Sequence, residues 1–137
     1  MLANFPFFLI SFAIYNMIVF LTPGVAWSDV LLNVPMQSGV VWPITLGDAL
    51  IALSLVFLFV EVLKATRTSN HSMFDHLLST VVFVAALVEF LLVPQAATSV
   101  FAILLLIALI DVLGGWSVSF RAAQRDLTVE AMPDATV

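Results

Sequence analysis

The sequence predicts an all-α integral membrane protein, a bundle of four transmembrane helices that forms a single domain. Of its 137 residues, 63% are hydrophobic and 9% are charged, whereas soluble domains average roughly 45–50% apolar and about 25% charged residues. Four apolar segments divide the chain, and each is long enough to cross a hydrocarbon core of roughly 30 Å. We expect residues 1–125 to form the membrane domain and residues 126–137 to be a flexible cytoplasmic tail.

The predicted spans occupy about residues 5–21, 43–63, 73–93 and 97–120. A cleaved signal peptide is the alternative interpretation of the first segment. That segment has no Lys or Arg before it, and it is longer than the apolar stretch of about 7–15 residues that a signal peptide carries. We therefore expect a span there.

The connections between the segments differ in character. The third and fourth spans are separated only by Pro94-Gln95-Ala96, which predicts a tight hairpin of two antiparallel helices. Residues 22–42 mix Pro, Gly and polar residues with the apolar run Val30-Leu31-Leu32. There we expect a loop with a short interfacial or re-entrant turn.

Basic residues predict the orientation, because Lys and Arg that flank a span are retained on the cytoplasmic side. The chain has four of them, and they follow the second and fourth spans: Lys64, Arg67, Arg121 and Arg125. Both termini are therefore expected in the cytoplasm, and the membrane is expected to be a bacterial inner membrane. Trp27 and Trp42 then fall at the outer interface, where indole rings are enriched.

Several classes of chemistry find no support in the sequence. The absence of Cys excludes disulfides, thiolate metal sites and cysteine nucleophiles. His71 and His76 are five residues apart rather than the four that place a metal-binding pair on one helix face. No phosphate-binding Gly-rich loop, nucleophile elbow or basic patch is present. We expect no enzyme activity, no catalytic residue, no metal, no cofactor and no nucleic-acid partner.

Acidic residues inside the predicted spans are the main functional clue. Glu89 lies in the third span and Asp111 deeper in the fourth, and an acid at the centre of a span costs roughly 2.5–3.5 kcal/mol. Both are candidates for proton or ion binding. Asp48 is a third candidate near the outer face, although Thr45-Leu46-Gly47-Asp48 also has the form of a capping box, which we favour. Glu61 is expected to form an ion pair with Lys64, three residues later.

A second group of residues suggests contacts between helices. Asp111, Gly115 and Ser119 recur every four residues and share one helix face, with Gly114 beside them. Small residues let another helix approach closely, and polar side chains form hydrogen bonds across the contact. Asn16, near the middle of the first span, is a packing candidate for the same reason.

Two functions are compatible with these features. The first is a small ion- or proton-conducting channel or transporter in which Glu89 and Asp111 are the titratable groups. The second is a non-transporting accessory or assembly subunit that uses the same residues to dock on a larger membrane complex. A bundle this small has little room for its own aqueous path, so beside the lipid bilayer we expect a second copy or a partner membrane protein.

Overall fold

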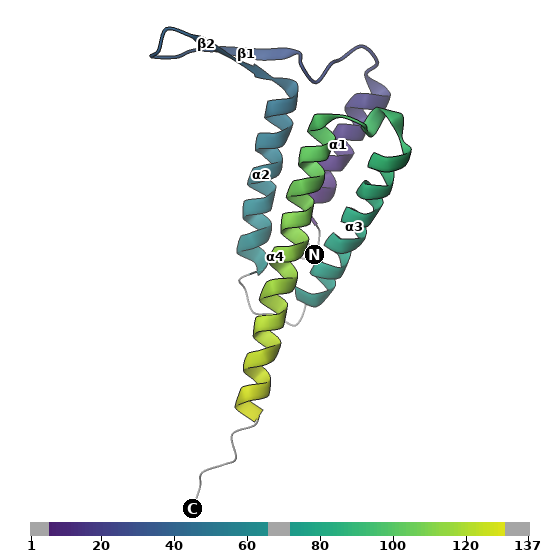
Figure 1. Ribbon diagram of the computed structural model, residues 1–137, viewed down its shortest axis with the longest axis vertical. Coiled ribbons are helices and arrows are strands. Elements are labelled where there is room, and N and C mark those ends of the chain that lie inside the picture. The colour runs from purple at the N-terminus through teal and green to yellow at the C-terminus, as the bar shows by residue number, and fades with distance from the viewer. Residues whose placement is uncertain (1–5, 66–71, 131–137) are drawn as a thin grey trace, which may run out of the picture.

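The computed structural model describes residues 6–65 and 72–130. In these residues the chain is mostly helical, with four long helices lying side by side and a small antiparallel sheet at one end (Figure 1). The elements in chain order are α1 (Phe8–Leu21), β1 (Val30–Pro35), β2 (Val41–Thr45), α2 (Leu46–Ala65), α3 (Ser72–Leu92), η2 (Pro94–Ala96) and α4 (Ser99–Glu130).

Two of the described helices are long and apolar enough to cross a membrane by length and composition. They are the stretches Leu46–Lys64 in α2 and Ser99–Ser117 in α4. The shorter apolar helices Phe8–Leu21 and His76–Leu92 correspond to the first and third predicted spans. Only 22% of the α2 stretch and 39% of the α4 stretch are buried within the chain, so most residues of both stretches are at least partly exposed.

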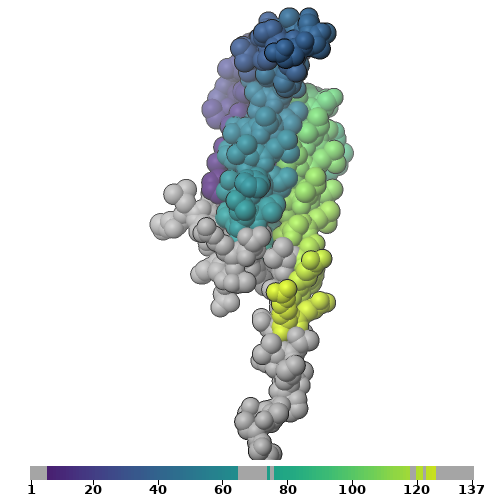
Figure 2. All heavy atoms as spheres, turned by 90° about the vertical axis from the view of Figure 1, so that its left-hand side faces the viewer, coloured from purple at the N-terminus to yellow at the C-terminus, as the bar shows by residue number. Residues whose placement is uncertain are grey.

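The helix α4 is longer than the sequence analysis expected. It continues to Glu130, whereas the sequence analysis placed the start of a flexible tail at residue 126; residues 131–137 lie outside the described part. At about 1.5 Å per residue, its 32 residues extend roughly 48 Å. Figure 2 shows its C-terminal part continuing beyond the end of α2.

The sheet corrects the prediction of a loop between the first two spans. β1 and β2 form an antiparallel hairpin in which Val34 pairs with Trp42 and Leu32 with Ile44. The turn is closed by a hydrogen bond from the Met36 nitrogen to the Val40 oxygen at 2.9 Å. Gly39 has φ +82° in this turn, a conformation that glycine adopts without steric cost. The hairpin extends sideways from the helices, roughly across their axes (Figure 1).

Aromatic rings fill the centre of the helical bundle near the hairpin end. Phe101 of α4 is fully buried, and its ring lies 5.3 Å from Phe12, 4.8 Å from Tyr15 and 6.0 Å from Phe90, measured between centroids. We call these four residues the aromatic layer. Aromatic pairs at such separations add attraction beyond the apolar area that they bury, so the layer ties α1, α3 and α4 together.

Polar contacts fix the hairpin end of the bundle. The Tyr15 hydroxyl donates to the Gln95 carbonyl oxygen at 2.9 Å and lies 2.7 Å from Thr98 Oγ1. Its ring stacks on Trp27, with centroids 4.6 Å apart. Thr98 Oγ1 also accepts a hydrogen bond from the Phe101 nitrogen at 3.2 Å, which satisfies one orphan amide at the start of α4. The connection between α3 and α4 is short, as the sequence predicted.

Candidate functional site

Polar side chains of α2, α3 and α4 gather inside the part of the bundle that lies away from the hairpin. Three of them are almost fully buried, because Glu61 is 7% exposed, His76 8% and Ser79 9%. Together with Lys64 and Asp111 they form what we call the polar cluster: Glu61, Lys64, His76, Ser79 and Asp111. Polar and charged groups are costly to bury without partners. The contacts of each member therefore show how its burial is compensated.

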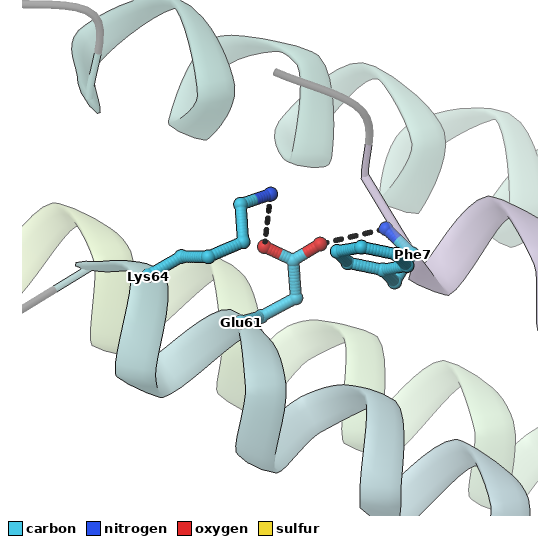
Figure 3. A network of polar contacts seen from close by, with 3 residues as sticks. All are labelled: Phe7, Glu61 and Lys64. Carbon is cyan, nitrogen blue, oxygen red and sulfur yellow. Dashed lines mark hydrogen bonds and ion pairs between the residues drawn. The ribbon is translucent and has the colours of Figure 1, made fainter. Parts of the chain in front are cut away.

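Glu61 links α2 to the start of α1. Its Oε1 accepts a hydrogen bond from the Phe7 nitrogen at 2.6 Å, and its Oε2 forms an ion pair with Lys64 Nζ at 3.2 Å (Figure 3). Since the first amides of a helix have no partner inside it, this carboxylate satisfies an amide at the start of another helix. Lys64 Nζ also lies 5.0 Å from the Phe7 ring centroid. The predicted Glu61–Lys64 ion pair is confirmed, but it is part of a contact between two helices.

Asp111 reaches both helices that flank α4. Its carboxylate accepts a hydrogen bond from the Ser79 hydroxyl on α3, and it lies within electrostatic range of Glu61 and Lys64 on α2. Asp111, for which we expected ion binding or a contact between helices, therefore has polar neighbours on two helices of its own bundle. Glu61, which we expected only to pair with Lys64, also acts electrostatically on Asp111.

His76 packs where α3 comes close to α4. A Cβ added at Gly115, one turn after Asp111, would fall on the ring atoms Nδ1 and Cε1 of His76. The close approach of the imidazole therefore requires glycine at position 115. Beside this contact, Trp116 Nε1 donates to Thr80 Oγ1 at 3.1 Å, and Thr80 Oγ1 donates to the His76 carbonyl oxygen at 2.8 Å.

Glu89 lies apart from the polar cluster. It follows Ser79, the partner of Asp111, by ten residues on α3, which corresponds to about 15 Å along the helix. Its nearby ionisable group is Tyr15, on which it acts electrostatically, and Tyr15 belongs to the hairpin end of the bundle. The two acids predicted inside spans are not brought together, in agreement with their expected difference in depth.

Asp48 caps the start of α2. Its Oδ2 accepts hydrogen bonds from the Thr45 nitrogen at 2.9 Å and from Thr45 Oγ1 at 2.7 Å, while the Asp48 nitrogen donates to Thr45 Oγ1 at 3.2 Å. This reciprocal arrangement confirms the predicted capping box. Asp48 is exposed and belongs to the hairpin end, so it does not join the polar cluster.

The four residues predicted to pack between helices have different surroundings. Gly115 is buried against His76, whereas a Cβ at Gly114 would meet no atom within 4 Å. Asn16 Oδ1 is buried and accepts no hydrogen bond from residues 6–65 or 72–130. Ser119 belongs to α4, but its side chain lies outside the described part of the structure.

The polar cluster combines two carboxylates, one ammonium group and one imidazole. Carboxylates and imidazole take up and release protons in acid–base chemistry, and carboxylate oxygens also bind monovalent cations. In the described residues, no group of three or more His, Cys, Asp or Glu side chains is arranged to hold a metal ion. The carboxylates and the imidazole of the cluster can therefore each take up a proton, and the carboxylates can also bind a cation.

Sequence reasoning missed the neighbours of Asp111. We expected Glu61 only to pair with Lys64 and did not expect His76 or Ser79 near Asp111, because periodicity along one helix does not show which helices adjoin it. The sequence did contain one indication that Glu61 and Asp111 lie at a similar depth, because both are in the half of their spans that ends in basic residues.

No protein-family model, curated protein or solved structure matches the chain.

Proposed function

We propose that this chain is an integral membrane protein in which α1–α4 all cross the bilayer and the polar cluster binds a proton or a monovalent cation during transport. The observation that carries the proposal is that Asp111 on α4 lies within electrostatic range of the Glu61–Lys64 ion pair on α2 in an apolar bundle. Ionisable groups within spans are costly and mark ion pathways. The conducting unit is an assembly of several copies or a complex with a partner membrane protein.

The distribution of apolar side chains supports the membrane assignment. The core helix of a soluble protein is mostly buried, whereas only 22% of the α2 stretch and 39% of the α4 stretch are buried. On α2, which faces the viewer in Figure 2, the exposed large side chains include Leu53, Val56, Phe59 and Val62. Soluble monomers rarely expose contiguous apolar surface of this extent, and a bilayer would cover it.

The charges favour one orientation. Lys64 ends α2, and Arg121 and Arg125 lie in the part of α4 that follows its apolar stretch; Arg67, the fourth basic residue, lies outside the described part. Since basic residues flank spans on the cytoplasmic side, this end of the bundle faces the cytoplasm and the hairpin faces the opposite compartment. Both termini then belong to the cytoplasmic side of an inner membrane.

The aromatic layer favours a second candidate function, that of a non-transporting accessory subunit. It lies between the polar cluster and the hairpin end, and in it the buried rings of Phe12 and Phe101 are in contact, while its one hydroxyl, that of Tyr15, is already bonded to Gln95 and Thr98. Transport through one copy would have to bypass these rings. An accessory subunit would use the polar cluster only to hold its own helices together.

Flux measurements in liposomes separate the two candidates. We expect the purified protein to carry protons or monovalent cations, and Asp111→Asn and Glu61→Gln to show the largest losses. Ser79→Ala, which keeps both carboxylates and removes one hydroxyl donor, should lose less. Asp48→Asn is the matched control, since Asp48 lies at the hairpin end and outside the cluster. Size-exclusion chromatography would check that each variant assembles like the parent protein.

The same experiment contains the outcomes that would reject transport. If the well-folded parent protein carries neither protons, Na⁺ nor K⁺, the accessory function replaces the transport proposal. Normal flux in both Asp111→Asn and Glu61→Gln would also remove the polar cluster from the pathway. Glu89→Gln is measured beside these variants, and a loss confined to it would move the ion-binding site to the hairpin end.

A further inference from the structure

The β1–β2 hairpin exposes an apolar face that the helical bundle does not cover. Cross-strand pairing places Leu32, Val34, Trp42 and Ile44 on one side of the sheet, and we call this set the apolar face. Leu32 is 57% exposed and Trp42 52%. The opposite side carries Asn33, Pro35, Val41 and Pro43, so its side chains are smaller and one of them is polar.

The charge and direction of the hairpin indicate what it contacts. Residues 30–45 contain no Asp, Glu, Lys, Arg or His, which leaves no basis for recognising a charged partner surface. The hairpin leaves the start of α2 and extends across the direction of the helices (Figure 1). If α2 crosses a bilayer, the hairpin then lies along its surface, continuous with the exposed apolar side of α2.

The backbone argues against pairing with a second copy through the strand edges. Pro35 and Pro43 lack the N–H that an added strand would need, and proline on an edge strand blocks such pairing. The register is also irregular between Val30 and Leu32. Because a two-stranded sheet still has unpaired backbone groups along its edges, it needs water or lipid headgroups nearby and cannot lie in the hydrocarbon centre.

We propose that the β1–β2 hairpin lies flat in the headgroup region of the bilayer, with its apolar face, including Leu32 and Trp42, inserted against lipid acyl chains. This inference rests on the proposed membrane placement of α2. Indole rings are enriched at this level of a bilayer, and an element with a large exposed apolar side binds there by burying that side. The hairpin would fix the depth and tilt of α2, to which β2 is joined directly.

Spin labels in lipid vesicles test the proposal, because the chain contains no Cys and each label needs a single substitution. Leu32→Cys places a label on the apolar face, and Val41→Cys, also exposed, places the matched label on the opposite side. Phe59→Cys, on the exposed side of α2, reports separately whether α2 is in lipid. Collision with oxygen, which concentrates in lipid, is compared with collision with a water-soluble nickel chelate.

We expect the label at position 32 to collide several-fold more with oxygen relative to the nickel chelate than the label at position 41. Position 59 should be the deepest of the three. Equal exposure of positions 32 and 41 to the nickel chelate, with position 59 in lipid, would overturn the hairpin inference alone. The hairpin inference would also be overturned if neither reagent reached the label at position 32, because the apolar face would then be covered by protein. A label at position 59 that is in water would overturn the membrane placement itself.

Discussion

At the scale of single residues, Gly115 and Gly114 form a natural pair for a packing test. Gly115→Ala should destabilise the protein by about 1–3 kcal/mol, because the new methyl group would overlap the His76 ring and force α3 away from α4. Gly114→Ala meets open space and should leave stability unchanged or slightly raised. Thermal or denaturant unfolding in detergent micelles measures both variants. Equal effects at the two positions would show that His76 does not pack against Gly115.

The same two glycines show what residue patterns could and could not predict. Spacing placed Gly115 on the face of Asp111 and marked it as a packing residue, but it gave Gly114 the same role and did not identify His76 as the neighbour. The capping box at Asp48 was predictable because Thr45 and Asp48 are three residues apart and interact within one turn. Local contacts follow from sequence spacing, whereas contacts between helices depend on how the helices are rotated.

At the scale of elements, one buried hydrogen bond joins α1 to α2. Ser11 and Ser54 are both fully buried, and their hydroxyl oxygens are 2.8 Å apart. Replacing either serine with alanine removes this contact, although Ser54 Oγ also lies 2.7 Å from the Leu50 carbonyl oxygen and keeps that partner in Ser11→Ala. We therefore expect Ser54→Ala to cost more, about 1–3 kcal/mol if the Ser11 hydroxyl is left without a partner.

A double-mutant cycle measures the coupling between the two serines. The double variant should cost less than the two single variants together, with a coupling near the roughly 0.6 kcal/mol average for polar pairs between membrane helices. Unfolding in increasing concentrations of a denaturing detergent gives the four stabilities. Strict additivity would contradict a direct contact between α1 and α2 at this position.

The sequence predicted the positions of the helices well where the apolar runs were long. Helix α2 begins at Leu46 and α3 ends at Leu92, within a few residues of the predicted spans. The β1–β2 hairpin was missed because neither of its sides is buried against the bundle, so its strands lack the alternation of apolar and polar residues that identifies a half-buried strand. The run Val30-Leu31-Leu32 was too short to indicate a strand by itself.

At the scale of the whole molecule, the arrangement of the polar cluster follows from the order in which the helices pack. Helix α4 contacts both α2 and α3, so Asp111 lies within electrostatic range of Glu61 on one neighbour and accepts a hydrogen bond from Ser79 on the other. The sequence predicted α3 as a neighbour through the short connection at η2, but nothing in it places α2 on the other side. The sequence could therefore predict that α3 adjoins Asp111, but it could not predict that α2 does.

The orientation of the whole molecule can be tested directly, because the parent protein has no Cys to give a background signal. Ser38→Cys places a thiol in the exposed turn of the hairpin, and Ala123→Cys places one on an exposed position of α4 between Arg121 and Arg125. Since basic residues are retained in the cytoplasm, a membrane-impermeant maleimide should label position 38 in intact bacterial cells and position 123 only after permeabilisation. Labelling of both positions from outside would place the hairpin and the end of α4 on one side and contradict an arrangement in which α4 crosses the membrane. The inverse pattern would retain the span but reverse its direction, and the polar cluster would then face the outer compartment.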